Sequence, residues 1–162
     1  MRVSSMVDIK SLLEYNQTIR NRYWDRLSKL PWKEFVKNRE ASFNSVRNIF
    51  VHTLGAIDYW LDFLEKKNLR WDKKFDEYDT FDSVKLYLEH VEKRMASYLR
   101  SLSPEKLRKE YTVTGEDHKT TTVQTEDILV HVFEEEVHHR GELIALLWQM
   151  GEDPPEMGWK GL

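Results

Sequence analysis

Apolar residues recur every three to four positions along four long stretches of the chain, which is the period of an amphipathic helix. We expect these four helices over about residues 8–30, 42 or 44–67, 80–102 and 125–150. Asp8 and Thr80 suit the N-caps of the first and third helices, and Gly151 suits the cap after the last. The core positions expected on the four helices include Leu13, Ile19, Tyr23, Leu27, Val46, Ile49, Phe50, Leu54, Ile57, Leu61, Val84, Leu86, Leu88, Val91, Met95, Leu99, Ile128, Val132, Leu143 and Leu147.

A different pattern separates the third and fourth helices. Two β-branched runs, residues 111–114 and 119–123, flank the turn residues 115–117, which predicts a small β-hairpin between residues 108 and 124. Four long helices with one longer connection indicate an all-α fold, a four-helix bundle whose long connection carries this hairpin. At 162 residues, the chain is expected to form a single domain over residues 1–162.

Composition narrows the function classes. The 25 basic and 28 acidic residues are well mixed and give a net charge of −3, which argues against nucleic acid as a partner. The absence of cysteine excludes disulfides, thiolate metal sites and a cysteine nucleophile. No apolar window is long enough for a membrane span, and the first residues lack the apolar run of a signal peptide, so we expect no membrane association and a cytoplasmic location.

The strongest candidate chemistry lies on the last helix. Glu135 and His139 are four residues apart, so they stand on one face of the helix and could chelate one divalent metal. At about 100° per residue, His139 falls roughly 25° and Glu135 roughly 65° from the centre of the apolar face. The same pair could instead form only a hydrogen bond, and the spacing alone leaves both interpretations open.

Other histidines and carboxylates compete for this role. His131 and His138 fall more than about 100° from the apolar face, toward solvent or a partner, although His131 remains a reserve ligand. Glu136 lies near the face, but Arg140 follows one turn later and can neutralise it. His52, on the second helix, lies roughly 125° from the centre of its apolar stripe, so the pattern only suggests it as a third ligand.

Two segments resemble the DinB-like (YfiT-like) family of metal-dependent helical proteins. One is residues 45–60, in which a helix-two histidine, His52, precedes Trp60 by two turns. The other is residues 129–143, with Leu147, Gly151 and the prolines at 154 and 155 beyond it. Together with the spacing of the helices and the hairpin, the resemblance covers nearly the whole chain.

The resemblance implies a metal site. Members typically bind a divalent cation through three histidines, of which His52 and His139 are present here, while Glu135 takes the place of the third. A carboxylate still binds nickel, zinc, iron or manganese, and it makes the site harder, which favours iron, manganese or nickel over zinc.

The resemblance also implies a function and partners. One hypothesis is a metal-dependent transferase or hydrolase that uses a low-molecular-weight thiol or another small-molecule substrate, with Asp58 or His138 assisting proton transfer. The alternative is a non-catalytic, stress-linked, metal-binding homodimer with a structural or vestigial site. Family members commonly dimerise, and we expect a homodimer with Trp60 and Trp148 in the bundle core or at the dimer contact. Three protein ligands would favour catalysis, and four would favour a structural site.

Overall fold

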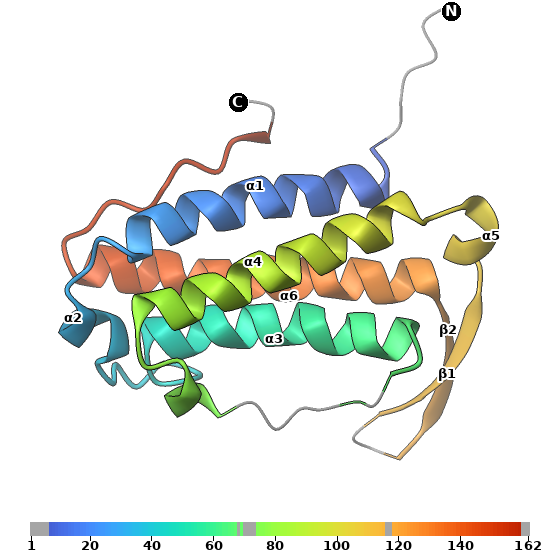
Figure 1. Cartoon of the computed structure of the whole chain (residues 1–162), viewed down its shortest axis with the longest axis horizontal. Coiled ribbons are helices and arrows are strands. Elements are labelled where there is room, and N and C mark those ends of the chain that lie inside the picture. The colour runs from blue at the N-terminus through green and yellow to red at the C-terminus, as the bar shows by residue number, and fades with distance from the viewer. Residues whose placement is uncertain (1–6, 68, 70–73, 116–117, 160–162) are drawn as a thin grey trace, which may run out of the picture.

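The protein is a bundle of four long helices with a small hairpin at one end (Figure 1). The computed structural model describes residues 7–67, 69, 74–115 and 118–159. The predicted four-helix bundle, with the hairpin in the connection before the last helix, is confirmed. The long helices are α1 (Ile9–Leu27), α3 (Val46–Leu64), α4 (Phe81–Arg100) and α6 (Thr125–Gln149).

The helices begin at local capping signals. The Asp8 carboxylate accepts the Ser11 backbone N–H at 2.8 Å, and Thr80 exchanges hydrogen bonds with Ser83, so both predicted N-caps are confirmed. The helix ends were predicted less well. The first helix ends at Leu27, yet Leu30 beyond it is buried at 6% exposure. Buried loop residues thus continue the apolar pattern past the true helix end.

Three one-turn elements within the described part of the chain were not predicted. They are α2 (Trp32–Val36), η1 (Phe75–Glu77) and α5 (Pro104–Leu107). Periodicity cannot detect a single turn, although Phe35 of α2 is fully buried and the side chain of Ser103 caps α5. The irregular segment between α2 and α3 brings Phe43 against His52 of α3 and Ser42 against Glu142 of α6.

The helix directions place α3 beside α6. In Figure 1, α1 and α6 run from right to left, whereas α3 and α4 run from left to right. Because α3 and α4 run in the same direction, their first turns lie at the same end of the bundle, where Arg47 near the start of α3 donates to the carbonyl of Tyr78, just before α4, at 3.3 Å. Antiparallel α3 and α6 pack directly against each other, which brings their polar side chains face to face.

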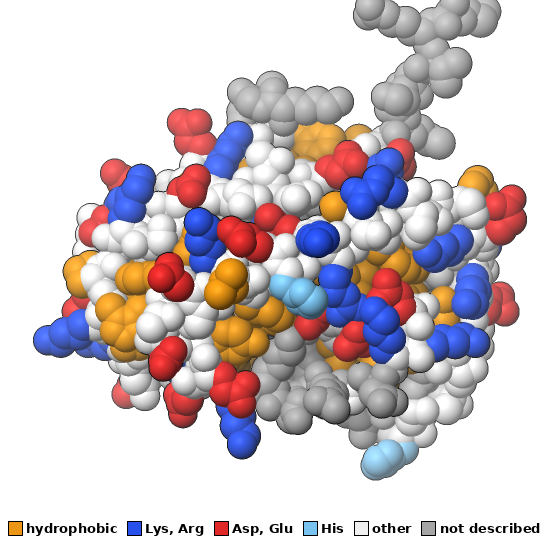
Figure 2. Space-filling view, viewed as in Figure 1, with side chains coloured by type: hydrophobic (Ala, Val, Ile, Leu, Met, Phe, Trp, Pro, Cys, Tyr) orange, Lys and Arg blue, Asp and Glu red, His pale blue; other side chains and the backbone are white. Residues whose placement is uncertain are grey.

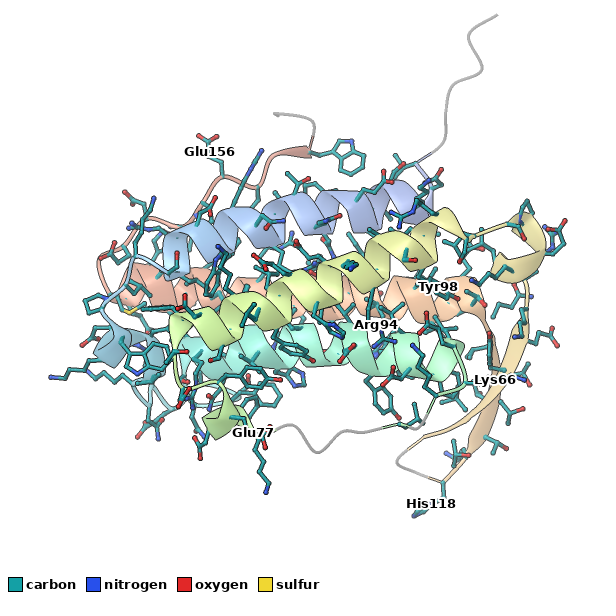
Figure 3. The ribbon with its side chains drawn as sticks, in the orientation of Figure 1. Lys66, Glu77, Arg94, Tyr98, His118 and Glu156 are labelled. Carbon is teal, nitrogen blue, oxygen red and sulfur yellow. The ribbon has the colours of Figure 1, made fainter. Side chains whose placement is uncertain are left out.

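The hairpin consists of β1 (Glu110–Thr114) and β2 (Thr120–Gln124). The strands are antiparallel and pair Thr112 with Thr122 and Val113 with Thr121. Turn residues 116 and 117 lie outside the described residues. His118, labelled in Figure 3, sits at the tip of the hairpin, far from the bundle.

The core is apolar and the outside is mixed in charge. Nearly all the predicted core positions are buried, but Leu86 is 67% exposed, because its place on α4 faces away from the other helices. Trp148 is 65% exposed and Trp60 is half-buried, so neither belongs to the closed core. Figure 2 shows acidic and basic side chains interspersed on the visible face. Among the described residues, the helices are too short or too polar to cross a membrane.

Candidate metal centre

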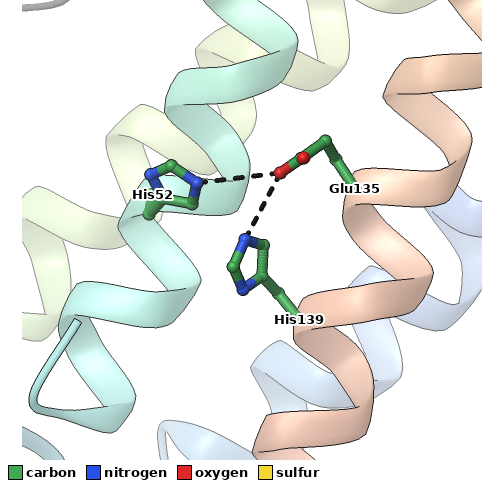
Figure 4. A group of neighbouring side chains, drawn as sticks. All are labelled: His52, Glu135 and His139. Atoms are coloured by element: carbon green, nitrogen blue, oxygen red, sulfur yellow. Dashed lines mark ion pairs between the residues drawn. The ribbon is translucent and has the colours of Figure 1, made fainter. Parts of the chain in front are cut away.

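Three side chains from two helices converge in the space between α3 and α6 (Figure 4). His52 comes from α3, and Glu135 and His139 come from successive turns of α6. The Glu135 Oε2 atom lies 3.3 Å from His139 Nε2 and 3.8 Å from His52 Nε2. One ligand atom from each residue lies within 4.8 Å of the other two. The structure therefore brings together the three residues that the sequence and the resemblance pointed to.

The separation of 3.3 Å is what one shared cation would require, and that of 3.8 Å is slightly longer. Two ligand atoms about 2.1 Å from a shared tetrahedral ion lie about 3.4 Å apart, so a small inward movement of His52 would complete the geometry. The same contacts would also arise if the Glu135 carboxylate paired with the two imidazoles without a metal. The donor set of two nitrogens and one oxygen nevertheless suits nickel, zinc, iron and manganese. Metal binding by these residues stays a prediction.

The surroundings of His52 favour its neutral form. Its side chain is only 11% exposed, because Phe43 stacks on the imidazole with ring centroids 3.8 Å apart and the His139 ring of α6 makes an edge-to-face contact with it at 4.8 Å. Burial, followed by the nearby His139, lowers the pKa of His52 below its ordinary value, although Glu135 acts in the opposite direction. A neutral imidazole has a free lone pair, which is the state that a metal ligand needs.

A second carboxylate holds His139 in place. The His139 Nδ1 atom lies 3.4 Å from Glu142 Oε2, and the Ser42 hydroxyl donates to the same oxygen at 2.6 Å. A hydrogen bond at Nδ1 fixes the tautomer that leaves Nε2 as an acceptor toward a cation. Glu142 was not predicted, although its position three residues after His139 was a usable signal. Nothing in the sequence pattern singled out Phe43 or Ser42.

The competing histidines lie at the edge of the centre. The His131 Nε2 atom is 4.0 Å from Glu135 Oε1, the oxygen that does not face the other two imidazoles, and its side chain is 48% exposed. His138, His139 and Glu142 form a second possible ligand group. That group comes from one helix, and its His138 side chain is 69% exposed. The group that joins two helices is the better-enclosed candidate.

Glu136, rather than Glu135, is the deeply buried carboxylate of α6. Its exposure is 3%, whereas the Glu135 side chain is 30% exposed, so Glu135 lies closer to the surface than its neighbour on the helix. The partner expected for Glu136, Arg140, was wrong. Arg20 of α1 binds it with two hydrogen bonds of 2.9 and 3.0 Å, while Arg140 donates to Asn16 at 2.6 Å. Neighbouring helices supplied both partners, which one-turn spacing cannot reveal.

Asp58 takes part in a different cluster. Its carboxylate pairs with Arg94 and accepts the Tyr87 hydroxyl at 3.3 Å, so it joins α3 to α4, where Figure 3 labels Arg94. Burial alone would lower the pKa of Arg94, but hydrogen bonds with Glu65 and Asp62 raise it above its ordinary value. These contacts engage Asp58 away from α6, so a role in proton transfer at the centre is without structural support.

Comparisons with known proteins agree with this architecture. The crystal structure of YjoA, a DinB-like protein from Bacillus subtilis, superposes with a TM-score of 0.66 at 18% sequence identity. The match covers 94% of this chain and 98% of that chain, and at this identity it shows the shared fold. No curated protein sequence matches the chain. The model of the DinB family matches residues 1–160, and the protein therefore belongs to the DinB family.

Proposed function

We propose that this protein binds one divalent cation through His52, Glu135 and His139 and uses it as a metal-dependent enzyme, a transferase or hydrolase of small molecules. The observation that carries the proposal is the convergence of two imidazole Nε2 atoms and one carboxylate oxygen from two helices within 4.8 Å. Nickel, zinc, iron and manganese all suit the ligands. Membership of the DinB family supports the same interpretation.

The residues have different roles in such a site. His52 and His139 supply neutral donors, and Glu135 supplies one negative charge, so a bound cation keeps a net positive charge. Phe43 covers one side of His52 and limits access of water there. A divalent cation held by three protein ligands supplies Lewis-acid activation of a water or thiol at its remaining position. A low-molecular-weight thiol as co-substrate is part of this proposal.

A metal titration tests the ligand set. When cobalt is titrated into protein purified without an affinity tag, the visible absorption should stop rising at one equivalent of cobalt per chain. His139→Ala should abolish that signal, whereas His138→Ala on the neighbouring, exposed position should retain it. Glu135→His should retain zinc binding or tighten it. Normal binding by His139→Ala together with loss in His138→Ala or His131→Ala would overturn the proposed ligand set.

The alternative function is a structural metal site in a non-catalytic protein. His131 is the residue that favours it, because its Nε2 atom lies 4.0 Å from the second oxygen of Glu135 and could approach as a fourth ligand. X-ray absorption of the zinc-loaded protein separates the two functions. Two imidazoles in the parent and unchanged spectra in His131→Ala support an open, catalytic site, whereas three imidazoles in the parent support the structural one.

We also propose that the protein is a homodimer whose contact lies on the outer face of α6. Val130, Val137 and Trp148 are exposed by 39%, 43% and 65%. At about 100° per residue they fall within roughly 20° of one line, opposite His139. Exposed apolar side chains aligned in this way suit an interface. Light scattering should give a dimer mass that Trp148→Glu reduces, and a monomeric parent at high micromolar concentration would contradict the proposal.

A further inference from the structure

A cavity of about 440 Å³ lies between the hairpin, α3 and α6. Its lining includes Trp60 from α3, Val113 from β1, Thr121 and Val123 from β2, and Ile128 and His131 from α6. Small-molecule sites typically have volumes of about 300–1,000 Å³, so the cavity is large enough for a compact organic group.

The cavity begins next to the candidate metal centre. His131 of the lining is one turn before Glu135 on α6, and Trp60 is two turns after His52 on α3. Four helical residues span about 6 Å along the axis. The ring centroids of Trp60 and His131 lie 5.4 Å apart in an edge-to-face contact, and His131 Nε2 is 4.0 Å from the Glu135 carboxylate. The same two helices therefore frame the centre and, one turn further along, the cavity.

The lining selects for an apolar occupant. Most of the lining surface is apolar, and four of the nine lining residues, Trp60, Val113, Val123 and Ile128, have apolar side chains. Of its two charged residues, Asp127 already accepts the Gln124 backbone N–H at 2.7 Å, and Lys119 has an opposite charge, so the lining offers no excess of either sign. Burial of apolar area is then the main source of binding free energy for a guest, at about 25 cal/mol per Å².

We infer that this cavity binds the apolar body of a small-molecule substrate whose metal-binding head group reaches His52, Glu135 and His139 past His131. The inference rests on the proposed function, because it assigns the cavity to the substrate of that metal centre. It adds the substrate class, namely compounds with a polar, metal-coordinating end and an aromatic or branched aliphatic group about one helical turn away.

Two hydroxamates and two matched variants test the inference. Acetohydroxamate and 3-phenylpropionohydroxamate carry the same metal-binding head, but only the second has an apolar body. Thr121→Trp fills the cavity, whereas Thr122→Trp makes the same change at the next residue of β2, which points to the opposite face of the hairpin. Both threonines are exposed, so neither change leaves a void. Binding is measured by the change in visible absorption of the cobalt-loaded protein.

The parent and Thr122→Trp should bind the phenyl compound at least about tenfold more tightly than acetohydroxamate, which corresponds to about 1.4 kcal/mol. Thr121→Trp should reduce this preference to less than about threefold, while its affinities for cobalt and acetohydroxamate remain those of the parent. A parent that binds cobalt without preferring the phenyl compound would overturn the inference and leave the metal site standing. A preference that both variants retain, or that both lose, would also overturn it. A parent that binds no cobalt would overturn the proposed function and the inference together.

Discussion

Two adjacent carboxylates on α6 carry the same charge and have different surroundings. Glu136 is buried and meets the guanidinium of Arg20, which also lies 3.3 Å from Glu92 of α4. Glu135, one residue earlier and about 100° around the helix, meets two imidazoles instead. A guanidinium neutralises a carboxylate permanently, whereas neutral imidazoles leave its charge available to a cation. The first carboxylate therefore joins helices, and the second suits chemistry.

The largest effect on stability should come from breaking the buried ion pair between Arg20 and Glu136. Arg20→Met leaves the Glu136 carboxylate without its main partner and should lower the free energy of unfolding by about 3–5 kcal/mol. The double variant Arg20→Met with Glu136→Met should recover much of this loss, because Glu136 no longer leaves a buried charge. Urea unfolding measures both. A loss below about 1 kcal/mol in Arg20→Met would contradict this contrast between Glu136 and Glu135. A loss in Glu135→Gln as large as that in Arg20→Met would contradict it too.

The group of His52, Glu135 and His139 should raise the free energy of unfolding only when metal is present. Zinc at about 100 times its dissociation constant should raise the free energy of unfolding by about 2.7 kcal/mol, because binding favours the folded state. His139→Ala should remove this increment, and His138→Ala should keep it. Unfolding by urea with and without zinc checks the prediction. An equal increment in both variants would place the metal outside the proposed centre.

Replacing Glu142, whose carboxylate lies beside His139 Nδ1, should have a smaller effect. Glu142→Gln weakens the acceptor at Nδ1 and should reduce metal affinity by about 10- to 100-fold, which corresponds to about 1.4–2.7 kcal/mol. Glu134→Gln changes an exposed carboxylate of the same helix and should leave the affinity unchanged. Calorimetric titration with zinc measures both. Equal affinities in the two variants would show that Glu142 does not orient the ligand.

The smallest effect concerns pH in the metal-free protein. Burial, followed by His139, lowers the pKa of His52 below its unfolded value of 6.5. Between the folded and unfolded pKa values the unfolded chain binds more protons, so stability should rise with pH up to about 6.5 and then level off. His52→Gln should flatten this rise, and His118→Gln at the hairpin tip should not. Urea unfolding from about pH 5 to 8 tests the sign, and a fall in stability over that range in the parent would contradict it.

The fold followed from the sequence because its determinants are local. Capping residues such as Asp8 and Thr80, and the β-branched runs before α6, act through neighbours within a few positions. The assignment of Glu136 failed because its partner, Arg20, is 116 residues away. Phe43 could not be foreseen either, since it reaches His52 from a segment without regular structure. Spacing within one helix predicted the pair on α6, but the third residue, His52, needed the family resemblance.

An anomalous difference map tests the central claim most directly. Crystals of protein purified without an affinity tag and grown with zinc should show one peak per chain, about 2.1 Å from His52 Nε2, His139 Nε2 and an oxygen of Glu135. Crystals of His139→Ala grown in the same way should lack that peak. A peak between His138 and Glu142, or a parent without any peak near α6, would contradict the proposed metal centre.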